Sequence, residues 1–134
     1  MEKAKKILIV EDEPMIRKAL VERFSEEKNL TVMSAKDGKE GLEAAFREHP
    51  DFILLDIIMP IMNGLEMLNH LREDEWGKDV QVMILSNLAD TEKKAEATAK
   101  GVKYFIIKSN VNISSVVEKV VAVMDGKELA EDDI

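Results

Sequence analysis

The sequence predicts an α/β fold in which a parallel sheet carries helices on both faces. Five apolar runs of four to six residues recur along the chain, and between most of them apolar residues return every three or four positions. Short runs rich in Ile, Val, Leu and Phe are typical of strands buried on both faces. Steps of three and four indicate amphipathic helices. Strands that alternate with helices predict a parallel sheet joined by right-handed crossovers.

The predicted strands are residues 7–10, 30–33, 52–55, 80–85 and 102–107. Their starts lie 22 to 28 residues apart, which is also the spacing of leucine-rich repeats. The leucine ladder with its asparagine is absent from every unit, so that alternative is rejected.

Four predicted helices carry a clear apolar stripe. The first follows Pro14, which suits the first turn of a helix, and Gly126 ends the last. The stripes are Ile16, Ala19, Leu20 and Phe24; Leu42, Ala45 and Phe46; Leu65, Leu68 and Leu71; and Ile113, Val116, Val117, Val120, Val121 and Met124.

The remaining helix, residues 91–100, should be weakly anchored. Its apolar stripe consists only of Ala95 and Ala99, with Leu88 upstream. Little buried apolar area means little stabilisation by packing, so we expect this helix to move most easily.

Length and composition limit the class of protein. The 134 residues suit one domain, and with no cysteine the chain forms neither disulfides nor thiolate metal sites. A net charge of -8 argues against direct nucleic-acid binding. No apolar stretch is long enough for a membrane span or a signal peptide, so we expect a cytoplasmic protein without membrane contact. We expect one domain over residues 1–124 and an acidic tail over 125–134, with no effector domain behind it.

Chemically capable side chains follow four of the five strands. In an open parallel sheet, the carboxyl ends of the strands form one edge, where ligands bind. The residues that follow the strands are Glu11, Asp12, Glu13, Asp56, Ser86 and Lys108. Neighbouring carboxylates about 4 Å apart repel by about 4 kcal/mol at an effective dielectric near 20, so the cluster requires protons or a cation. Oxygen ligands without His or Cys favour Mg²⁺.

The same set suits phosphoryl transfer, which needs a carboxylate nucleophile, a metal and positioned donors. Each residue taken alone also has a simpler interpretation. Asp12 or Glu13 could cap the helix that begins at Pro14, Ser86 could be a turn residue and Lys108 a solvated lysine. Asp56 interrupts an apolar run, which favours a paired or functional acid.

Four motifs occur in order across residues 7–108: ILIVEDEP, FILLDIIMPIMNG, VMILSN and GVKYFIIK. With them the chain resembles the receiver domains of bacterial response regulators up to about Met124. The resemblance implies a flavodoxin-like, doubly wound sheet of five parallel strands in the order 2-1-3-4-5 with five helices. It implies that Asp56 accepts a phosphoryl group from the phosphohistidine of a sensor histidine kinase or phosphotransfer protein.

The resemblance also implies the roles of the remaining site residues. Asp12 would hold Mg²⁺ directly and Glu11 through water, and Ile58 would add its backbone carbonyl. Ser86 and Lys108 would contact the phosphoryl group, and Phe105 would be the aromatic residue that changes rotamer on activation.

Three positions depart from the family pattern. Asn87 stands where a small residue is usual, and Phe105 lacks a common tyrosine hydroxyl, although Tyr104 should point to the opposite face of the strand. Ser109 replaces a common proline, which disfavours a cis peptide bond there by roughly 3 kcal/mol.

We therefore expect a phosphorylation switch that catalyses only its own phosphorylation and dephosphorylation and binds a downstream protein. The alternative is a pseudo-receiver, an interaction module that is not phosphorylated. An enzyme on a related sheet is disfavoured, because Asp56-Ile57-Ile58 lacks the Asp-x-Asp of dehalogenase-type phosphatases. The acids at 11–13 would also repel the phosphate of flavin mononucleotide.

Overall fold

The computed structural model describes residues 4–87, 91–110 and 112–129. Five parallel strands form one sheet in the order β2-β1-β3-β4-β5, which confirms the predicted fold and strand order. The strands are β1 (Lys5–Val10), β2 (Leu30–Ala35), β3 (Phe52–Leu55), β4 (Gln81–Ser86) and β5 (Phe105–Ile107).

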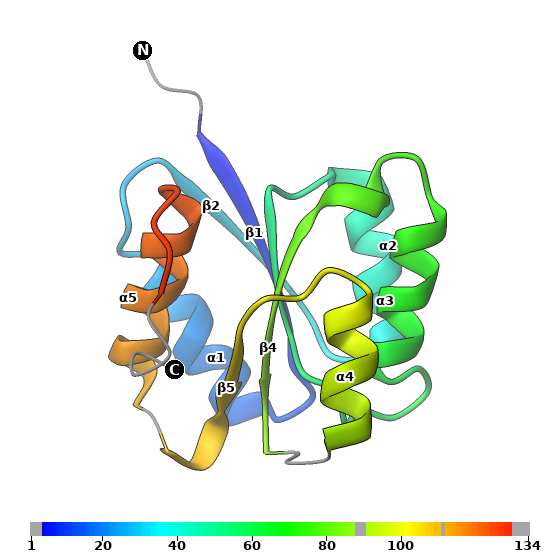
Figure 1. Ribbon diagram of the computed structural model, residues 1–134. Helices are drawn as coiled ribbons and strands as arrows, with labels where there is room; N and C mark the ends of the chain where they lie inside the picture. The colour runs from blue at the N-terminus through cyan, green and yellow to red at the C-terminus, as the bar shows by residue number, and fades with distance from the viewer. Residues whose placement is uncertain (1–3, 88–90, 111, 130–134) are drawn as a thin grey trace.

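Helices cover both faces of the sheet (Figure 1). One face carries α1 (Pro14–Phe24) and α5 (Ile113–Met124). The other carries α2 (Gly38–Glu48), α3 (Gly64–Glu73) and α4 (Thr91–Ala99). Two short 3-10 helices, η1 (Gly77–Asp79) and η2 (Lys108–Asn110), were not predicted. No helix among the described residues has both the length and the apolar character needed to cross a membrane.

The register of the sheet brings the carboxyl ends of four strands to one edge. Val10 at the end of β1 pairs with Leu55 at the end of β3, and Leu55 pairs with Ile84 near the end of β4. Ser86 in turn pairs with Ile107 of β5. The residues that follow these strands are therefore held by a buried, hydrogen-bonded frame rather than by free loops.

The fifth strand begins later than predicted. Residues 102–107 were expected, but β5 starts at Phe105. Gly101 has a φ of 89°, and Val102 donates a backbone hydrogen bond to the carbonyl of Ala97 at 3.1 Å. This is the pattern of a Schellman motif, so Val102 is buried as part of the end of α4 rather than as strand.

The predicted apolar stripe of α4 is wrong. Ala95 and Ala99 are exposed, and the buried alanine is Ala97. Leu88 lies outside the described residues. In α4, Ala97 is the one buried side chain among the described residues, so the expected weak anchorage holds although the residue assignment does not.

In α2 the predicted apolar residue Phe46 is 40% exposed, and the helix packs instead through small residues. A Cβ on Gly41 would lie 2.9 Å from the Cγ atoms of Val10, so this helix approaches β1 too closely for a larger side chain. Ala44 and Ala45 complete that contact face.

The chain turns back after α5. Gly126 has a φ of 89°, and Lys127 donates a backbone hydrogen bond to the carbonyl of Ala122 at 3.0 Å. The backbone N–H of Leu129 then reaches the Tyr104 hydroxyl at 3.0 Å, and its side chain packs against the core on the α1/α5 face. Residues 125–129 of the predicted tail therefore contact the domain, while residues 130–134 lie outside the described part.

Candidate functional site

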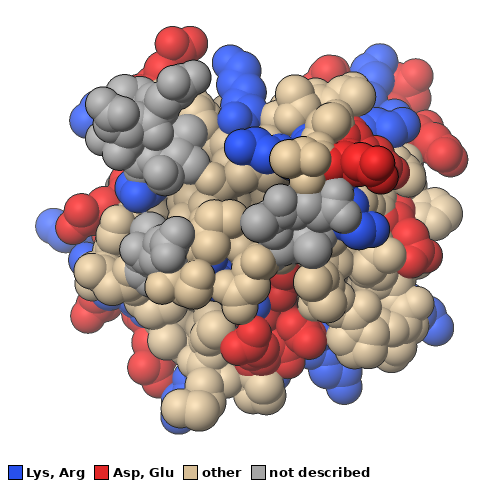
Figure 2. All heavy atoms as spheres, turned by 60° about the horizontal axis from the view of Figure 1, so that its bottom comes forward, with Lys and Arg blue, Asp and Glu red and all other residues tan. Residues whose placement is uncertain are grey.

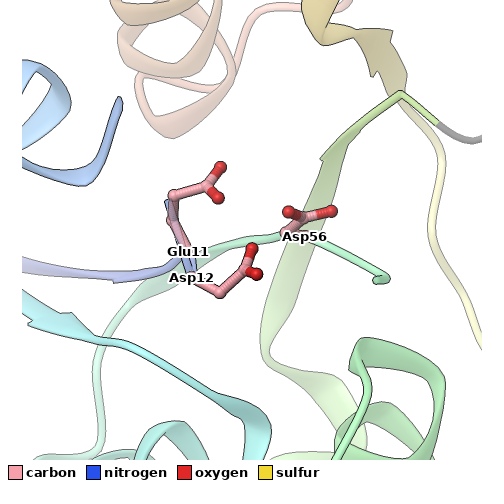
Figure 3. Close-up of side chains that lie close together, drawn as sticks. All are labelled: Glu11, Asp12 and Asp56. Atoms are coloured by element: carbon pink, nitrogen blue, oxygen red, sulfur yellow. The ribbon is translucent and has the colours of Figure 1, made fainter. Parts of the chain in front are cut away.

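Three of the predicted acids meet at the carboxyl edge of the sheet. Glu11 and Asp12 follow β1, Asp56 follows β3, and Figure 3 shows their side chains directed toward one space. One carboxylate oxygen of each lies within 4.8 Å of the others. Figure 2 turns this edge toward the viewer, and a group of acidic side chains lies at the lower centre of that face.

Backbone hydrogen bonds fix two of these acids. The N–H of Glu11 donates to the carbonyl of Ala35 in β2, and the N–H of Asp56 donates to the carbonyl of Val10 in β1, both at 3.0 Å. Each residue thus continues the ladder of the sheet by one position. Glu11 is 2% exposed and Asp56 is 4% exposed, so both carboxylates are held in a largely desolvated place.

Lys108 joins the acids from the end of β5. Its Nζ lies 2.8 Å from Oδ2 of Asp56 and 2.7 Å from Oε1 of Glu11, and the lysine side chain is only 6% exposed. The simple interpretation of Lys108 as a solvated lysine is therefore wrong. One buried ammonium group is shared between two buried carboxylates. Removing any one of the three would leave a buried charge without its partner, which is strongly destabilising.

Glu13 was predicted to lie at this edge of the sheet, but no role in the site was predicted for it. It occupies the N-cap position of α1, but its side chain makes no capping hydrogen bond. Its Oε1 instead lies 3.1 Å from Nζ of Lys108, and its N–H donates to Oε2 of Glu11 at 3.0 Å. The available signal was that Glu13 directly follows the acidic pair at the end of the first strand.

The pKa of Glu11 is raised chiefly by its burial. Burial raises the pKa of Glu11 to about 7, and repulsion from Asp56 adds to this, while hydrogen bonds from Lys108 and Glu13 oppose it. Burial would lower the pKa of Lys108, but the hydrogen bonds with Asp56 and Glu11 raise it above its ordinary value overall. Lys108 therefore stays charged, and Glu11 binds a proton more readily than an exposed glutamate.

The loop after Asp56 folds back against Asp56 itself. The N–H of Ile58 donates to Oδ1 of Asp56 at 3.3 Å, and the Ile58 side chain is 57% exposed. The N–H of Gly64 donates to the carbonyl of Ile57 at 2.8 Å. A Cβ at Gly64 would overlap the backbone carbonyl of Asp56, so only glycine allows α3 to begin this close to the site.

The remaining predicted residues lie at the end of β4 and at the start of β5. Ser86 ends β4 and is 2% exposed, and Asn87 beside it is exposed. Phe105 is half-buried against the core of the α2/α3/α4 face, with Nζ of Lys94 5.3 Å from the ring centroid. Tyr104 packs on the α1/α5 face, which confirms that these neighbours point in opposite directions. All peptide bonds among the described residues are trans, that of Lys108–Ser109 included.

The donor set fits a hard divalent cation such as Mg²⁺. Glu11, Asp12 and Asp56 offer carboxylate oxygens, which Mg²⁺ prefers, and this group, found among the described residues, contains neither His nor Cys. Oε1 of Glu11 is buried and accepts no hydrogen bond from the described residues, although Lys108 lies close to it. The buried Glu11 carboxylate, with one oxygen within 4.8 Å of an oxygen of each of the other two acids, is placed to bind a cation or its bound water.

Comparison with known proteins agrees with this geometry. The model of the response regulator receiver domain family matches residues 7–121. The nitrate/nitrite response regulator protein NarL of Escherichia coli is 37% identical over 103 residues, which are 76% of this chain and 47% of NarL. A protein-glutamate methylesterase/protein-glutamine glutaminase of Geobacillus kaustophilus is 36% identical over 129 residues, 92% of this chain and 36% of the enzyme. This chain thus spans about half or less of the length of these relatives.

Solved structures give the same fold. The chemotaxis response regulator CheY4 of Vibrio cholerae superimposes with a TM-score of 0.77 at 28% identity, covering 91% of this chain and 98% of that one. The response regulator domain of Thermotoga maritima CheB gives a TM-score of 0.79 at 26% identity, covering 92% and 96%. Proteins of this kind are signalling domains of two-component systems, for which phosphorylation and Mg²⁺ binding are general. The chain belongs to the response regulator receiver domain family.

Proposed function

We propose that this chain is a phosphoacceptor in a two-component relay, with Asp56 as the residue that accepts the phosphoryl group. The observation that carries the proposal is the buried contact of 2.8 Å between Asp56 and Lys108 within the acid cluster. A buried carboxylate beside a fixed cation is a nucleophile with a partner already in place for the incoming negative charge. The receiver unit would comprise residues 1–124 and act in the cytoplasm.

In the transfer step, a carboxylate oxygen of Asp56 forms a bond to phosphorus as the P–N bond of a phosphohistidine breaks. The donor imidazole leaves and takes up a proton from solvent. Lys108 then pairs with a phosphoryl oxygen, and Ser86 donates its hydroxyl to another. Because Lys108 already contacts Asp56, it needs no long movement to follow the new charge.

Mg²⁺ would be held by Glu11, Asp12, Asp56 and the backbone carbonyl of Ile58. The bound ion would neutralise negative charge on the phosphoryl oxygens during transfer. Within the chain, Glu11 and Asp12 come from one strand end and Asp56 from its neighbour, so the ladder of the sheet sets the relative position of the ligands.

The switch would act through α4, β5 and α5. A phosphoryl group adds about -1.5 to -2 charges, and the pull of Ser86 toward it would open space that Phe105 can fill. Phe105 contacts Lys94 of α4, and α4 is held by the buried Ala97. Movement of this weakly anchored helix would change a face that binds a downstream protein.

The donor would be a sensor histidine kinase or a phosphotransfer protein. A hybrid signal transduction histidine kinase of Dictyostelium discoideum is 34% identical to this chain over 102 residues, 6% of that kinase. The reaction alters only the protein itself, so we do not propose turnover of an external substrate.

The test is the intact mass of the protein after incubation with acetyl phosphate. With Mg²⁺ we expect the gain of one phosphoryl group, and with EDTA we expect none. Asp56→Asn should abolish the gain, whereas the matched variant Asp125→Asn, an exposed residue after α5, should keep it. No gain in the folded wild-type protein from either acetyl phosphate or a panel of phosphorylated kinases would instead favour a pseudo-receiver.

A further inference from the structure

A second cleft lies at the edge of the sheet opposite the acid cluster. It has a volume of about 240 Å³ and is formed where β3 and β4 begin and where the chain enters β5. Phe52, Val82 and Met83 contribute apolar surface to its lining. This volume is several times the roughly 30 Å³ share of one water molecule, so a small organic anion fits.

The cleft is lined mainly by positively charged residues, although the chain as a whole is negatively charged. The chain has a net charge of -8, yet four cationic residues and a single acid, Asp79, line the cleft. The cations are Arg72, Lys78, Lys100 and Lys103. Lys78 already pairs with the exposed Glu75 at 3.1 Å. The other three form no ion pair with a described carboxylate, so their charge is available to a ligand.

Hydrogen bonds hold Arg72 in the cleft through two of its three guanidinium nitrogens, Nε and Nη1. Nε donates to the carbonyl of Lys100 at 2.7 Å, and Nη1 donates to the carbonyls of Gly77 and Val80, both at 2.8 Å. Nη2 makes no hydrogen bond to a described residue. These neutral partners hold the side chain in one orientation, and Asp79 is the one acid that lines the cleft with it.

The space in front of Nη2 is open because Gly101 lies there. A Cβ at Gly101 would stand 3.7 Å from Nη2, and a longer side chain would fill the approach to the guanidinium. Burial lowers the pKa of Arg72 and nearby Asp79 raises it, as expected for a partly desolvated cation. An anion placed beside Nη2 would return the electrostatic stabilisation that burial removes.

We propose that this cleft binds the phosphate group of a small soluble phosphomonoester, with Arg72 Nη2, Lys100 and Lys103 as its partners. A planar guanidinium with fixed donors suits phosphate oxygens, and the two lysines add charge at the mouth. The apolar part of the lining would receive the organic portion of the ligand. The site is separate from Asp56 and does not depend on its phosphorylation.

The test is a titration of the ¹⁵N-labelled protein with glycerol phosphate at constant ionic strength, in EDTA. Glycerol phosphate is not a phosphodonor, and EDTA removes the metal that would draw phosphate to the acid cluster. We expect saturable shifts of the amides at 77–80 and 100–104, with the amides at 11–13 and 56–58 unmoved. Saturation confined to the acid cluster, or no saturation, would overturn the proposal.

Matched double variants separate a built site from general charge attraction. Lys100→Gln/Lys103→Gln should weaken binding about tenfold. Lys18→Gln/Lys39→Gln changes the net charge equally at exposed positions away from the cleft, and should leave the Kd unchanged. Equal weakening by both pairs would contradict the proposal. So would binding to vesicles that contain phosphatidic acid without binding of glycerol phosphate, since that would assign the cleft to a lipid headgroup.

Discussion

Nζ of Lys108 lies 2.8 Å from Oδ2 of Asp56. The two residues are 52 positions apart in the sequence and follow β5 and β3, which are separated in the sheet by β4. The contact exists because both residues follow strands whose ends the sheet aligns. It ties the stability of the domain to the chemistry of the site, since the same lysine also neutralises Glu11. The predictions below test the two roles separately.

Lys108→Met should lower the free energy of unfolding by about 3 kcal/mol, because it leaves two buried carboxylates without their cation. Mg²⁺ should restore a large part of this loss by replacing the missing charge. Urea denaturation with and without Mg²⁺ measures both effects, and Lys39→Met, at an exposed position of α2, is the control. A loss of the same size at saturating Mg²⁺ would contradict a shared cation site.

Metal-free stability should fall as pH rises from about 4.5 to about 7. The pKa of Glu11 is raised from 4.5 to about 7, so in this window the folded state holds a proton that the unfolded state has released. The difference corresponds to about 3 kcal/mol. Mg²⁺ should accordingly stabilise the protein more at pH 8 than at pH 5.

Glu11→Gln isolates this effect, because it removes the titrating group while keeping the shape of the side chain. The variant should show a flatter dependence of unfolding free energy on pH than the wild type, whereas Glu43→Gln on the exposed side of α2 should not. Parallel pH curves for wild type and Glu11→Gln would show that Glu11 is already ionised in the folded state.

Gly64→Ala should destabilise the domain by about 3 kcal/mol and slow phosphorylation. Its methyl group would overlap the carbonyl of Asp56, so either α3 or the strand end that carries Asp56 must shift. Gly126→Ala is the control, since there a Cβ meets no atom within 4 Å and the cost is only the left-handed backbone, about 1 kcal/mol. Equal losses in the two variants would refute the steric argument.

Amides of α4 should exchange with deuterium at least about tenfold faster than those of α5, an opening free energy lower by about 1.4 kcal/mol. In α5, Val116, Val117, Val120 and Val123 are buried, whereas in α4 the buried side chain is Ala97. Native-state hydrogen exchange measures the difference. Equal protection of the two helices would remove the reason for assigning the movable element to α4.

The alternation of apolar runs and helices in the sequence predicts a parallel sheet and the convergence of Glu11, Asp12, Asp56 and Lys108 at its carboxyl edge, whereas the strand order came from the family resemblance. It does not support finer details that depend on packing. Ala97 rather than Ala95 faces the core, and the buried Val102, which follows the helix end at Gly101, donates to the Ala97 carbonyl. The contact of Glu13 with Lys108 depends on side-chain geometry that no spacing encodes.

The sequence also gives no sign of the strained backbone at Ile61. Ile61 has a φ of 70°, a conformation that β-branched residues rarely adopt, in the loop that follows the phosphoacceptor candidate. The N–H of Met62 donates to the carbonyl of Pro60 at 2.7 Å, so Ile61 is the central residue of a three-residue turn. A turn prediction from residue type would place Gly or Asn there.

Chemical trapping tests the central claim most directly, because it locates the phosphoryl group at a single residue. Borohydride reduces an aspartyl phosphate to homoserine, which peptide mass mapping then assigns. After incubation with acetyl phosphate and Mg²⁺, we predict homoserine at position 56 and at no other acidic position. Homoserine at position 12, the corresponding 2-amino-5-hydroxypentanoic acid at position 11 or 13, or no reduced residue at all in protein whose fold is intact, would contradict the assignment of Asp56 as the phosphoacceptor.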